Sequence, residues 1–498
     1  MPSYAEGGKV RIEIHGHRSV PQPTKGEPVS AGQETGMASR RPTRTRRSAV
    51  LAVAVVAAVS LFAGACGGDR SDSTTDTTKK GGASSTSFGD LESPCGKGTP
   101  SGPTSQGVTA DSVTIGFGDD AGYATVPGLN KEMSDAIKAM IAWCNEQGGI
   151  NGRKVVGNYY DAAIMNVNNA MAEACGQVFM LVGQGWSLDS AQEQTRLGCA
   201  LPSVPTFAIS PVFAHGKLMY QPLPNPVDKV PIEYGYAMAE MFPEQVKKAA
   251  VMTANFAALK DSTDKAKLAL PAAGWTFLDC EQSYNITGEA DFKPFVQRLK
   301  DCGAEVVYFA GSPAPNFQNV LDAAKQLNYS PIWMTDANFY DSTFAKWNTS
   351  SNADKVYVSL GFTPFEQAST NPATQKYLDL LAKSNGKTAL AGAQATSAFL
   401  LWASAAQQCG DTLTRDCVMS KLAAVHEWTG GGLHTATDPG ANNPPECGIV
   451  LKLTGTKFEQ VYPATMGEFD CSPKYVGTVT GPLVTAANLD ANRIAQPK

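Results

Sequence analysis

Residues 148–154 read Gly-Gly-Ile-Asn-Gly-Arg-Lys, and the pattern of apolar residues changes across them. Before this stretch, apolar residues recur at the spacing of one helical face: Met133, Ile137, Met140, Ile141 and Cys144. After it, residues 154–160 have the composition of a strand. Paired glycines are typical of a helix end. Because an alternating run at 112–118 precedes the helix, the stretch lies inside a strand–helix–strand unit.

The same alternation continues along the chain. Further strands are predicted at 178–182, 204–209, 248–253, 275–280, 305–310, 332–335 and 355–360. Helices are predicted at 169–175, 261–270, 292–299 and 317–327. Strands interleaved with helices predict parallel sheets that are covered on both faces. The fold class is therefore α/β, with two doubly wound lobes.

The stretch 222–231 holds four prolines between the two series of strands, and we expect the hinge there. A long helix over 391–407 is predicted to pack back onto the first lobe. The turn-rich residues 428–446 precede a strand over 449–453, which we expect to return to the second lobe.

The N-terminal part has the layout of an export signal. Five arginines between residues 40 and 47 precede an apolar run over 49–63, which is shorter than the roughly 20 residues that span a membrane. Residues 63–66, Ala-Gly-Ala-Cys, resemble the lipobox of bacterial lipoproteins, so Cys66 is the expected lipidation site. The alternative is a simple cleaved signal, with Cys66 lost or free. Met37 directly precedes this segment, and we expect translation to start there.

These patterns give the expected domain organisation. Its parts are 1–36, untranslated or disordered; 37–65, signal peptide; 66–109, lipid-anchored flexible tether; 110–226 and 361–430, lobe 1; 227–360 and 431–470, lobe 2; 471–498, C-terminal tail. The expected location is extracytoplasmic, on the outer face of the cell membrane.

Eleven cysteines are many for a reduced cytosolic protein. With Cys66 set aside, ten remain, and an even number in an exported chain suggests five disulfides. Pairing neighbours in order gives Cys95–Cys144, Cys175–Cys199, Cys280–Cys302, Cys409–Cys417 and Cys447–Cys471. The sequence alone does not fix this pairing, and one or two free thiols are the alternative.

Composition excludes several classes of protein. The chain has 498 residues, of which 43% are hydrophobic and 17% charged, so it is neither disordered nor fibrous. Residues 1–65 hold nine Lys/Arg and four Asp/Glu, and the remainder, with 32 basic and 42 acidic residues, has a net charge of −10. Because polyanion binding requires clustered Lys and Arg, we expect no nucleic-acid partner.

The stretch 148–154, placed between a long helix and a strand that ends in Tyr160-Asp161, resembles the type I periplasmic-binding-protein fold. The branched-chain amino-acid-binding group, which serves ABC importers, is the most similar. A second likeness is Asp-Phe-Lys-Pro at 291–294, followed by Arg-Leu-Lys at 298–300 and the segment 303–309. Cys175 and Cys199 match a first-lobe disulfide of that group. The likeness covers residues 110–465.

The resemblance implies a monomeric two-lobed receptor without a cofactor or metal, which closes on a small solute and delivers it to an ABC-transporter permease. In lobe 1 it implies ligand contacts from loops after strands: Asp120, Tyr123, Trp186, Ser187, Thr206, Phe207 and Ser210. In lobe 2 it implies Asn255, Phe256, Ser312 and Asp336. Each has a structural alternative: Trp186 as a core residue, Asp120 in a solvated turn, the Ser and Thr hydroxyls as turn hydrogen-bonders, and Asp336 as the cap of a helix over 338–344.

The expected solute has an apolar or aromatic body and one carboxylate or amide. The group often holds an α-ammonium with a carboxylate after the third strand of lobe 2, where this chain has Gly-Ser-Pro-Ala-Pro at 311–315. A buried ammonium without a counter-charge costs several kcal/mol, which disfavours a branched-chain amino acid unless Asp336 is the partner.

A secreted hydrolase is the main rival class. The nearest approach to a nucleophile elbow, Gly-Trp-Ser-Leu-Asp at 185–189, lacks the closing glycine. His426-Glu427 has no second histidine for zinc, and no phosphate-binding Gly-x-x-x-x-Gly-Lys loop occurs in the sequence. We therefore expect no enzyme activity. An extracytoplasmic sensor on the same fold remains an open alternative to an importer component.

Overall fold

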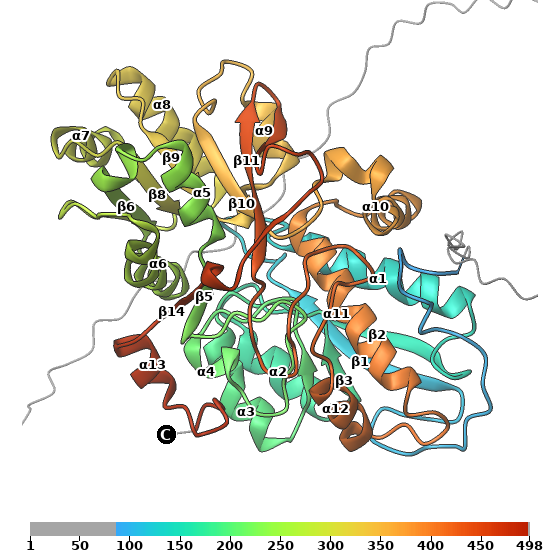
Figure 1. Ribbon diagram of the computed structural model, residues 1–498. Coiled ribbons are helices and arrows are strands. Elements are labelled where there is room, and N and C mark those ends of the chain that lie inside the picture. Colours follow the sequence, from blue (N-terminus) through green and yellow to red (C-terminus); the bar gives the residue numbers. More distant parts are fainter. Residues whose placement is uncertain (1–85, 497–498) are drawn as a thin grey trace, which may run out of the picture. The chain divides into compact units, whose positions relative to one another are not determined.

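Two sheets form the centre of the structure, a computed structural model that describes residues 86–496 (Figure 1). The smaller sheet has four parallel strands in the order β2-β1-β3-β4. Their bounds are β1 (Ser112–Asp119), β2 (Lys154–Asp161), β3 (Met180–Val182) and β4 (Ser203–Val204). We call this sheet and its helices lobe 1.

Helices cover both faces of the lobe 1 sheet (Figure 1). They are α1 (Lys131–Glu146), α2 (Val167–Cys175), α3 (Glu193–Gly198), α4 (Pro211–Ala214), α10 (Pro372–Ser384), α11 (Leu390–Gln407) and α12 (Arg415–Ala423). Helix α11 carries no charged residue and is buried along most of its length, as an apolar helix inside a domain should be. It packs against α1, so the predicted return of this helix to the first lobe is confirmed.

The larger sheet forms lobe 2 and has the strand path β12-β11-β10-β9-β8-β6-β7. Strands β6 (Ala249–Ala254), β7 (Gln282–Tyr284), β8 (Val306–Ala310), β9 (Ile332–Thr335) and β10 (Val356–Leu360) are parallel. Strands β11 (Cys447–Thr454) and β12 (Lys457–Tyr462) extend the sheet in antiparallel fashion, and β13 (Asp470–Cys471) pairs with β11. The predicted return of the chain to this lobe is confirmed by the pairing of β11 with β10.

The helices of lobe 2 follow the predicted alternation. They are α5 (Glu233–Met241), α6 (Ala257–Ala269), α7 (Lys293–Asp301), α8 (Gln318–Gln326) and α9 (Ser342–Trp347). Among residues 86–496, none of the helices combines the length and apolar character needed to cross a bilayer. The predicted signal peptide and Cys66 lie outside the described residues.

Three predicted elements differ in the structure. The strand expected at 275–280 is displaced to β7, and of the expected stretch only Phe277 forms a bridge, to Ala249. The strand expected at 204–209 ends at Val204 because the Asp189 carboxylate accepts the N–H groups of Ile209 and Ser210 in place of a neighbouring strand. The helix expected over 338–344 begins later, at α9.

The expected tether over 66–109 is too long at its C-terminal end. Phe88 is fully buried against Trp143, Cys95 forms a disulfide with Cys144, and the N–H of Gly96 donates to the carbonyl of Gly149 at 2.7 Å. Residues 86–109 therefore pack on lobe 1, because a few apolar side chains and one disulfide hold a segment that is otherwise rich in Gly, Ser and Thr. The other expected lobe boundaries stay predictions.

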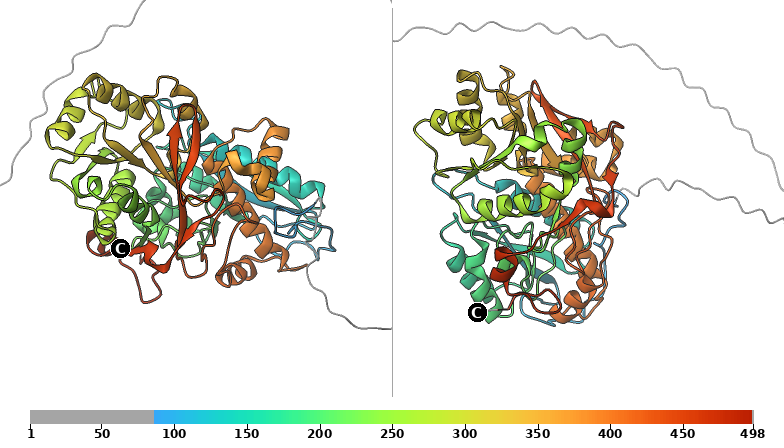
Figure 2. Two further views of the ribbon diagram at one scale, coloured as in Figure 1. Left: turned by 45° about the horizontal axis from the view of Figure 1, so that its top comes forward. Right: turned by 60° about the vertical axis from the view of Figure 1, so that its left-hand side comes forward.

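Several segments cross between the lobes (Figure 2). Strand β5 (Lys229–Pro231) lies at the end of the proline-rich stretch and pairs with β14 (Val476–Thr478) near the C-terminus. The structure contains five disulfides, and their pairing is the in-order one given above. Each disulfide joins elements of a single lobe, so none locks one lobe to the other.

Candidate ligand-binding site

A cavity of about 360 Å³ lies between the lobes at the carboxyl ends of their strands. Lobe 1 lines it with residues 206–209, which follow β4, and with Leu390 and Gln394 of α11. Lobe 2 lines it with one face of α6, Tyr308 on β8 and Asp336 after β9. Residues 223–231, which connect the lobes, complete the wall. We call this space the main cavity.

A second hollow of about 360 Å³ adjoins the main cavity. It is lined by the loop after β1 at 126–130, by residues 312–314 after β8 and by residues 337–343 after β9. Ala337, Leu390 and Gln394 line both spaces, so the two are neighbouring parts of one interlobe cleft.

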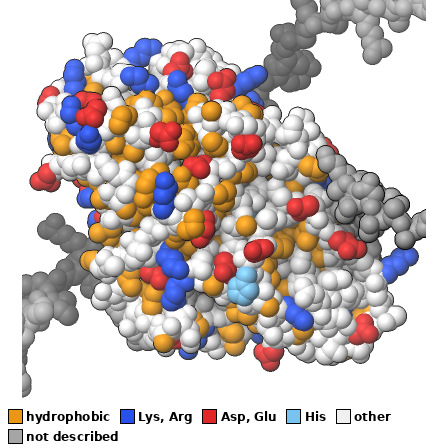
Figure 3. Space-filling model, in the orientation of Figure 1, with side chains coloured by type: hydrophobic (Ala, Val, Ile, Leu, Met, Phe, Trp, Pro, Cys, Tyr) orange, Lys and Arg blue, Asp and Glu red, His pale blue; other side chains and the backbone are white. Residues whose placement is uncertain are grey.

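The main cavity has mostly apolar walls. Its larger apolar side chains are Phe207, Ile209, Leu223, Val227, Val230, Phe362, Leu390 and Leu483. On the face drawn in Figure 3, hydrophobic side chains are frequent over the left half and lie between scattered charged groups. An apolar wall with a few polar groups is typical of a small-molecule site.

Lys265 of α6 is the cation of the main cavity. Its Nζ donates to Oδ1 of Asn225 at 2.7 Å and to the carbonyl of Pro226 at 2.8 Å. Burial lowers the pKa of Lys265 to about 8, against the opposing influence of Asp228, Asp261 and Asp336. The ammonium therefore stays mostly charged at neutral pH.

Three carboxyl groups line the same cavity: Glu233, Asp261 and Asp336. Burial raises the pKa of Glu233 to about 7, although Ser359 Oγ donates to its carboxylate at 2.5 Å. Burial also raises the pKa of Asp336, which accepts a hydrogen bond from the Tyr308 hydroxyl. Burial is the main reason why the pKa of Asp261 is raised as well. These acids can accept from an ammonium or, when protonated, donate to an oxygen.

Lobe 1 contributes backbone donors to the main cavity. Within the described part of the chain, the N–H groups of Phe207 and Ala208 have no hydrogen-bond partner. Both residues line the cavity, and Ala208 is fully buried. Because these two N–H groups are free to donate at the wall of the cavity, they are suited to a carboxylate or carbonyl oxygen of a solute.

The structure brings only some of the expected ligand residues to the cleft. Thr206, Phe207 and Asp336 line the main cavity, and Ser312 lines the second hollow. The hydroxyl of Thr206 already donates to the carbonyl of Gly183 at 2.9 Å. The side chain of Asp336 forms no helix cap, and Asp341 caps α9 instead. The capping alternative for Asp336 is therefore wrong.

The other expected residues lie elsewhere. Trp186 is 1% exposed and packs in the core of lobe 1. Asp120 accepts the N–H and the hydroxyl of Ser187, both at 2.8 Å, and Ser210 caps α4. The remaining three, Tyr123, Asn255 and Phe256, are in loops outside the lining of both spaces. The hydrogen bonds between Asp120 and Ser187 thus join the loop after β1 to the loop after β3 at the edge of the lobe 1 sheet.

Sequence reasoning missed Lys265 and Glu233. Lys265, Ala266 and Ala269 recur at the spacing of one helical face, and all three are buried in α6. A lysine on that face was a signal that could have been used. Glu233 gave no such signal, because its burial depends on β10 and β11, which come more than a hundred residues later.

A serine–histidine pair occurs away from the cleft. Ser397 Oγ and His434 Nε2 are 2.8 Å apart, and the Trp428 indole N–H donates to the same oxygen at 2.9 Å. Ser397 is fully buried, and burial lowers the pKa of His434 to about 4. This pair joins α11 to the turn-rich residues 428–446 as a structural contact. Within residues 86–496, no group of three or more His, Cys, Asp or Glu side chains is placed to hold a metal ion.

Comparison with known proteins places this geometry in context. A model of the periplasmic binding protein family matches residues 112–457, which is most of the chain. No curated protein matches the sequence.

Solved structures share the fold at low sequence identity. A fatty acid ABC transporter substrate-binding protein from Thermomonospora curvata has a TM-score of 0.60 and 14% identity, over 75% of this chain and 97% of the other. A solute-binding protein from R. palustris in complex with 4-hydroxybenzoate has a TM-score of 0.57 and 15% identity, over 70% of this chain and 96% of the other. A branched-chain amino acid transporter substrate-binding protein from Streptococcus pneumoniae in complex with isoleucine has a TM-score of 0.55 and 16% identity, over 71% of this chain and 100% of the other. At these identities the likeness establishes the fold alone.

Proposed function

This chain belongs to the periplasmic binding protein family, and we propose that it captures a small solute outside the cytoplasm and delivers it to the permease of an ABC importer. The observation that carries the proposal is the main cavity, which both lobes and the segments between them line. A cavity between two hinged lobes can close around a solute and remove it from water. Binding then changes the surface that the permease meets.

The proposed solute has an apolar or aromatic body and one carboxylate or amide. The apolar walls fit the body, and the ammonium of Lys265 together with the N–H groups of Phe207 and Ala208 fits the polar end. Isoleucine and 4-hydroxybenzoate, the ligands of two similar structures, both combine an apolar body with a carboxyl group.

A branched-chain amino acid is the second candidate, and Asp336 favours it. An α-ammonium buried in the main cavity needs a counter-charge, and Asp336 is a buried carboxyl group of lobe 2 in the wall of that cavity. The two candidates differ in whether the solute itself carries an ammonium group.

A thermal-shift panel separates them. The protein is heated with octanoate, 4-hydroxybenzoate, leucine, isoleucine or valine, and we expect an aliphatic or aromatic acid to raise Tm most. A solute at a hundred times its Kd stabilises the folded state by about 2.7 kcal/mol. The largest rise with leucine, isoleucine or valine, and none with the acids, would reverse the order of the two candidates. No rise with any solute would contradict the proposed solute class.

The variant Asp336→Asn gives a second test. It removes the counter-charge for an ammonium, so an amino acid should lose at least about tenfold in affinity, equal to about 1.4 kcal/mol, whereas a simple acid should lose little. Asp264→Asn, on the outer side of α6 where Asp264 pairs with Lys260, is the matched control. Titration calorimetry measures both. Equal losses in the two variants would contradict a ligand role for Asp336.

The proposal includes a lipid anchor on Cys66 at the outer face of the cell membrane. Its support is the sequence Ala-Gly-Ala-Cys at 63–66 behind the apolar run. The five disulfides suit an oxidising compartment.

A further inference from the structure

The chain continues beyond the part that the family model matches. After residue 457 it completes β12 and β13, and then forms β14 and the short helix α13 (Pro482–Ala487). We call residues 473–496 the C-terminal strap. It runs from lobe 2 to lobe 1 (Figures 1 and 2).

The first half of the strap is anchored on lobe 2. Strand β14 pairs with β5 in antiparallel register, with Gly477 opposite Val230. Val479 is 1% exposed and belongs to the core cluster of lobe 2 that contains Ile232 and Tyr234. Its N–H donates to the carbonyl of Asp228 at 2.9 Å. This part of the strap is therefore held on lobe 2 by the pairing of β14 with β5 and by the packing of Val479 in the core.

The second half of the strap is anchored on lobe 1. Helix α13 packs against α4. The Ala495 N–H donates to the carbonyl of His215 at 2.8 Å, and His215 Nδ1 lies 2.6 Å from the carbonyl oxygen of Arg493. The Val227 N–H donates to Nε2 of the same ring at 2.9 Å, so Nδ1 carries the proton and donates to Arg493. The buried imidazole thus joins the strap to the segment between the lobes.

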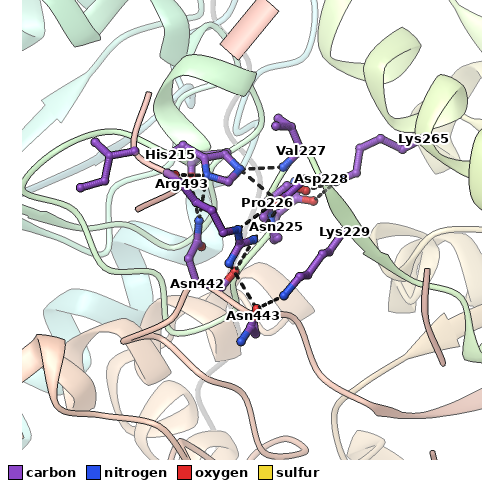
Figure 4. A network of polar contacts seen from close by, with 12 residues as sticks. His215, Asn225, Pro226, Val227, Asp228, Lys229, Lys265, Asn442, Asn443 and Arg493 are labelled. Atoms are coloured by element: carbon purple, nitrogen blue, oxygen red, sulfur yellow. Dashed lines mark hydrogen bonds and ion pairs between the residues drawn. The ribbon is translucent and has the colours of Figure 1, made fainter. Parts of the chain in front are cut away.

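Arg493 fixes the strap to the hinge by charge (Figure 4). Its Nε and one terminal nitrogen donate to the two carboxylate oxygens of Asp228 at 2.8 and 2.7 Å, and its other terminal nitrogen donates to the carbonyl of Ala441 at 2.7 Å. Burial acts to raise the pKa of Asp228, but Arg493 outweighs it and the pKa lies below its usual value. A two-point guanidinium–carboxylate pair of this kind is directional as well as strong.

Leu483 lies between these two anchors and faces the main cavity. It is 9% exposed and lines the cavity together with Pro211, Val227 and Val230. The anchors on both sides hold its helix in place, so the side chain is a fixed part of the wall.

We propose that Leu483, supplied by the C-terminal strap, is a specificity-determining residue that sets how large an apolar body the main cavity accepts. The inference rests on the proposed function, which it deepens. In an apolar pocket a difference of one methylene changes binding about 10- to 200-fold, so the size of this side chain discriminates between homologous solutes.

The test measures the affinities of hexanoate, octanoate, decanoate and 4-hydroxybenzoate by titration calorimetry. Leu483→Trp reduces the cavity, so the largest solute that the unchanged protein binds should lose at least about tenfold in affinity, and smaller solutes should lose less. Leu483→Ala enlarges the cavity and should move the preference toward the longer acid. Ala486→Trp, on the exposed side of the same helix, is the matched control and should change nothing.

Folding is checked by Tm and near-ultraviolet circular dichroism, and Leu483→Met, which keeps the volume, should retain the original preference. If all solutes keep their relative affinities in Leu483→Trp and Leu483→Ala, the inference is overturned and the proposed function stands. If no solute binds the unchanged protein, the proposed solute class fails, and the inference fails with it.

Discussion

Glu233 is a carboxyl group held at the start of lobe 2 in an apolar setting. It begins α5, accepts a hydrogen bond from Ser359 on β10 and lies against Gly448 of β11. Within the described residues its Oε2 has no hydrogen-bond partner. Three elements of lobe 2 thus surround one acid, and the charged form is the one that this environment disfavours.

The pH dependence of folding should report this group. The pKa of Glu233 is raised from 4.5 to about 7, so the folded state binds the proton more tightly than the unfolded state. Its contribution to stability is fully present below pH 4.5 and is lost as the pH rises toward 7, by about 3 kcal/mol. We expect Glu233→Gln to remove this loss, so that the variant is more stable than the unchanged protein at pH 7.5 and similar at pH 4.5.

Urea unfolding at the two pH values measures the effect. Glu244→Gln is the control, because Glu244 is exposed and pairs with Lys247 at the surface. An equal pH dependence in the Glu233→Gln variant and the unchanged protein would show that Glu233 is already ionised in the fold.

Single residues of the site were predictable where chain position decides the placement. Asp336 directly follows β9 and Phe207 lies three residues after the end of β4, and parallel strands bring their carboxyl ends to one edge. Trp186 also follows a strand, but its ring turns into the core of lobe 1, and nothing in the local sequence distinguishes the two directions. Lys265 was missed because lysines on helices usually face water.

At the scale of elements, the disulfides differ in the length of the chain segment between their two cysteines. Cys95 and Cys144 are 49 residues apart and join the segment before β1 to α1, whereas Cys409 and Cys417 are only 8 apart. A longer closed loop removes more entropy from the unfolded chain.

Replacing each pair by serine should therefore cost unequal amounts. We expect a loss in the free energy of unfolding of about 4 kcal/mol for Cys95→Ser with Cys144→Ser, and of about 2.5 kcal/mol for Cys409→Ser with Cys417→Ser. Guanidinium unfolding under oxidising conditions measures both. A larger loss for the shorter loop would mean that local contacts, and not chain entropy, determine the cost.

Most elements were predictable because apolar runs and helical spacing are local properties. Strand β9 and helix α11 match the expected ranges to within one residue. The misplaced elements depend on distant partners: β4 is short because Asp189 takes the N–H groups that a strand would use, and residues 86–109 are ordered by α1. The structure of the strap could not be predicted from the sequence, because its small residues are held in place by the distant elements β5 and α4.

At the scale of the whole molecule, the proposed lipid anchor on Cys66 would place solute capture at the outer face of the cell membrane. In a host that processes lipoproteins, we expect the protein in the membrane fraction and in the detergent phase of a Triton X-114 partition. Cys66→Ser removes the acceptor thiol, so this variant should leave the membrane fraction. Ser73→Ala, seven residues further along, is the control and should stay with the membrane. Partition of the unchanged protein into the aqueous phase would instead support the simple cleaved signal.

The strap has a practical consequence for the study of this receptor. Ala495 and Arg493 hold the end of the strap beside His215 of lobe 1 and Asp228 of the segment that connects the lobes. If the lobes move on binding, an environment-sensitive dye attached at Gln496, at the end of the strap, should change its fluorescence when the contact between the strap and the connecting segment changes. Fluorescence titration of such a conjugate offers a biosensor format for screening nutrient libraries without any labelled compound.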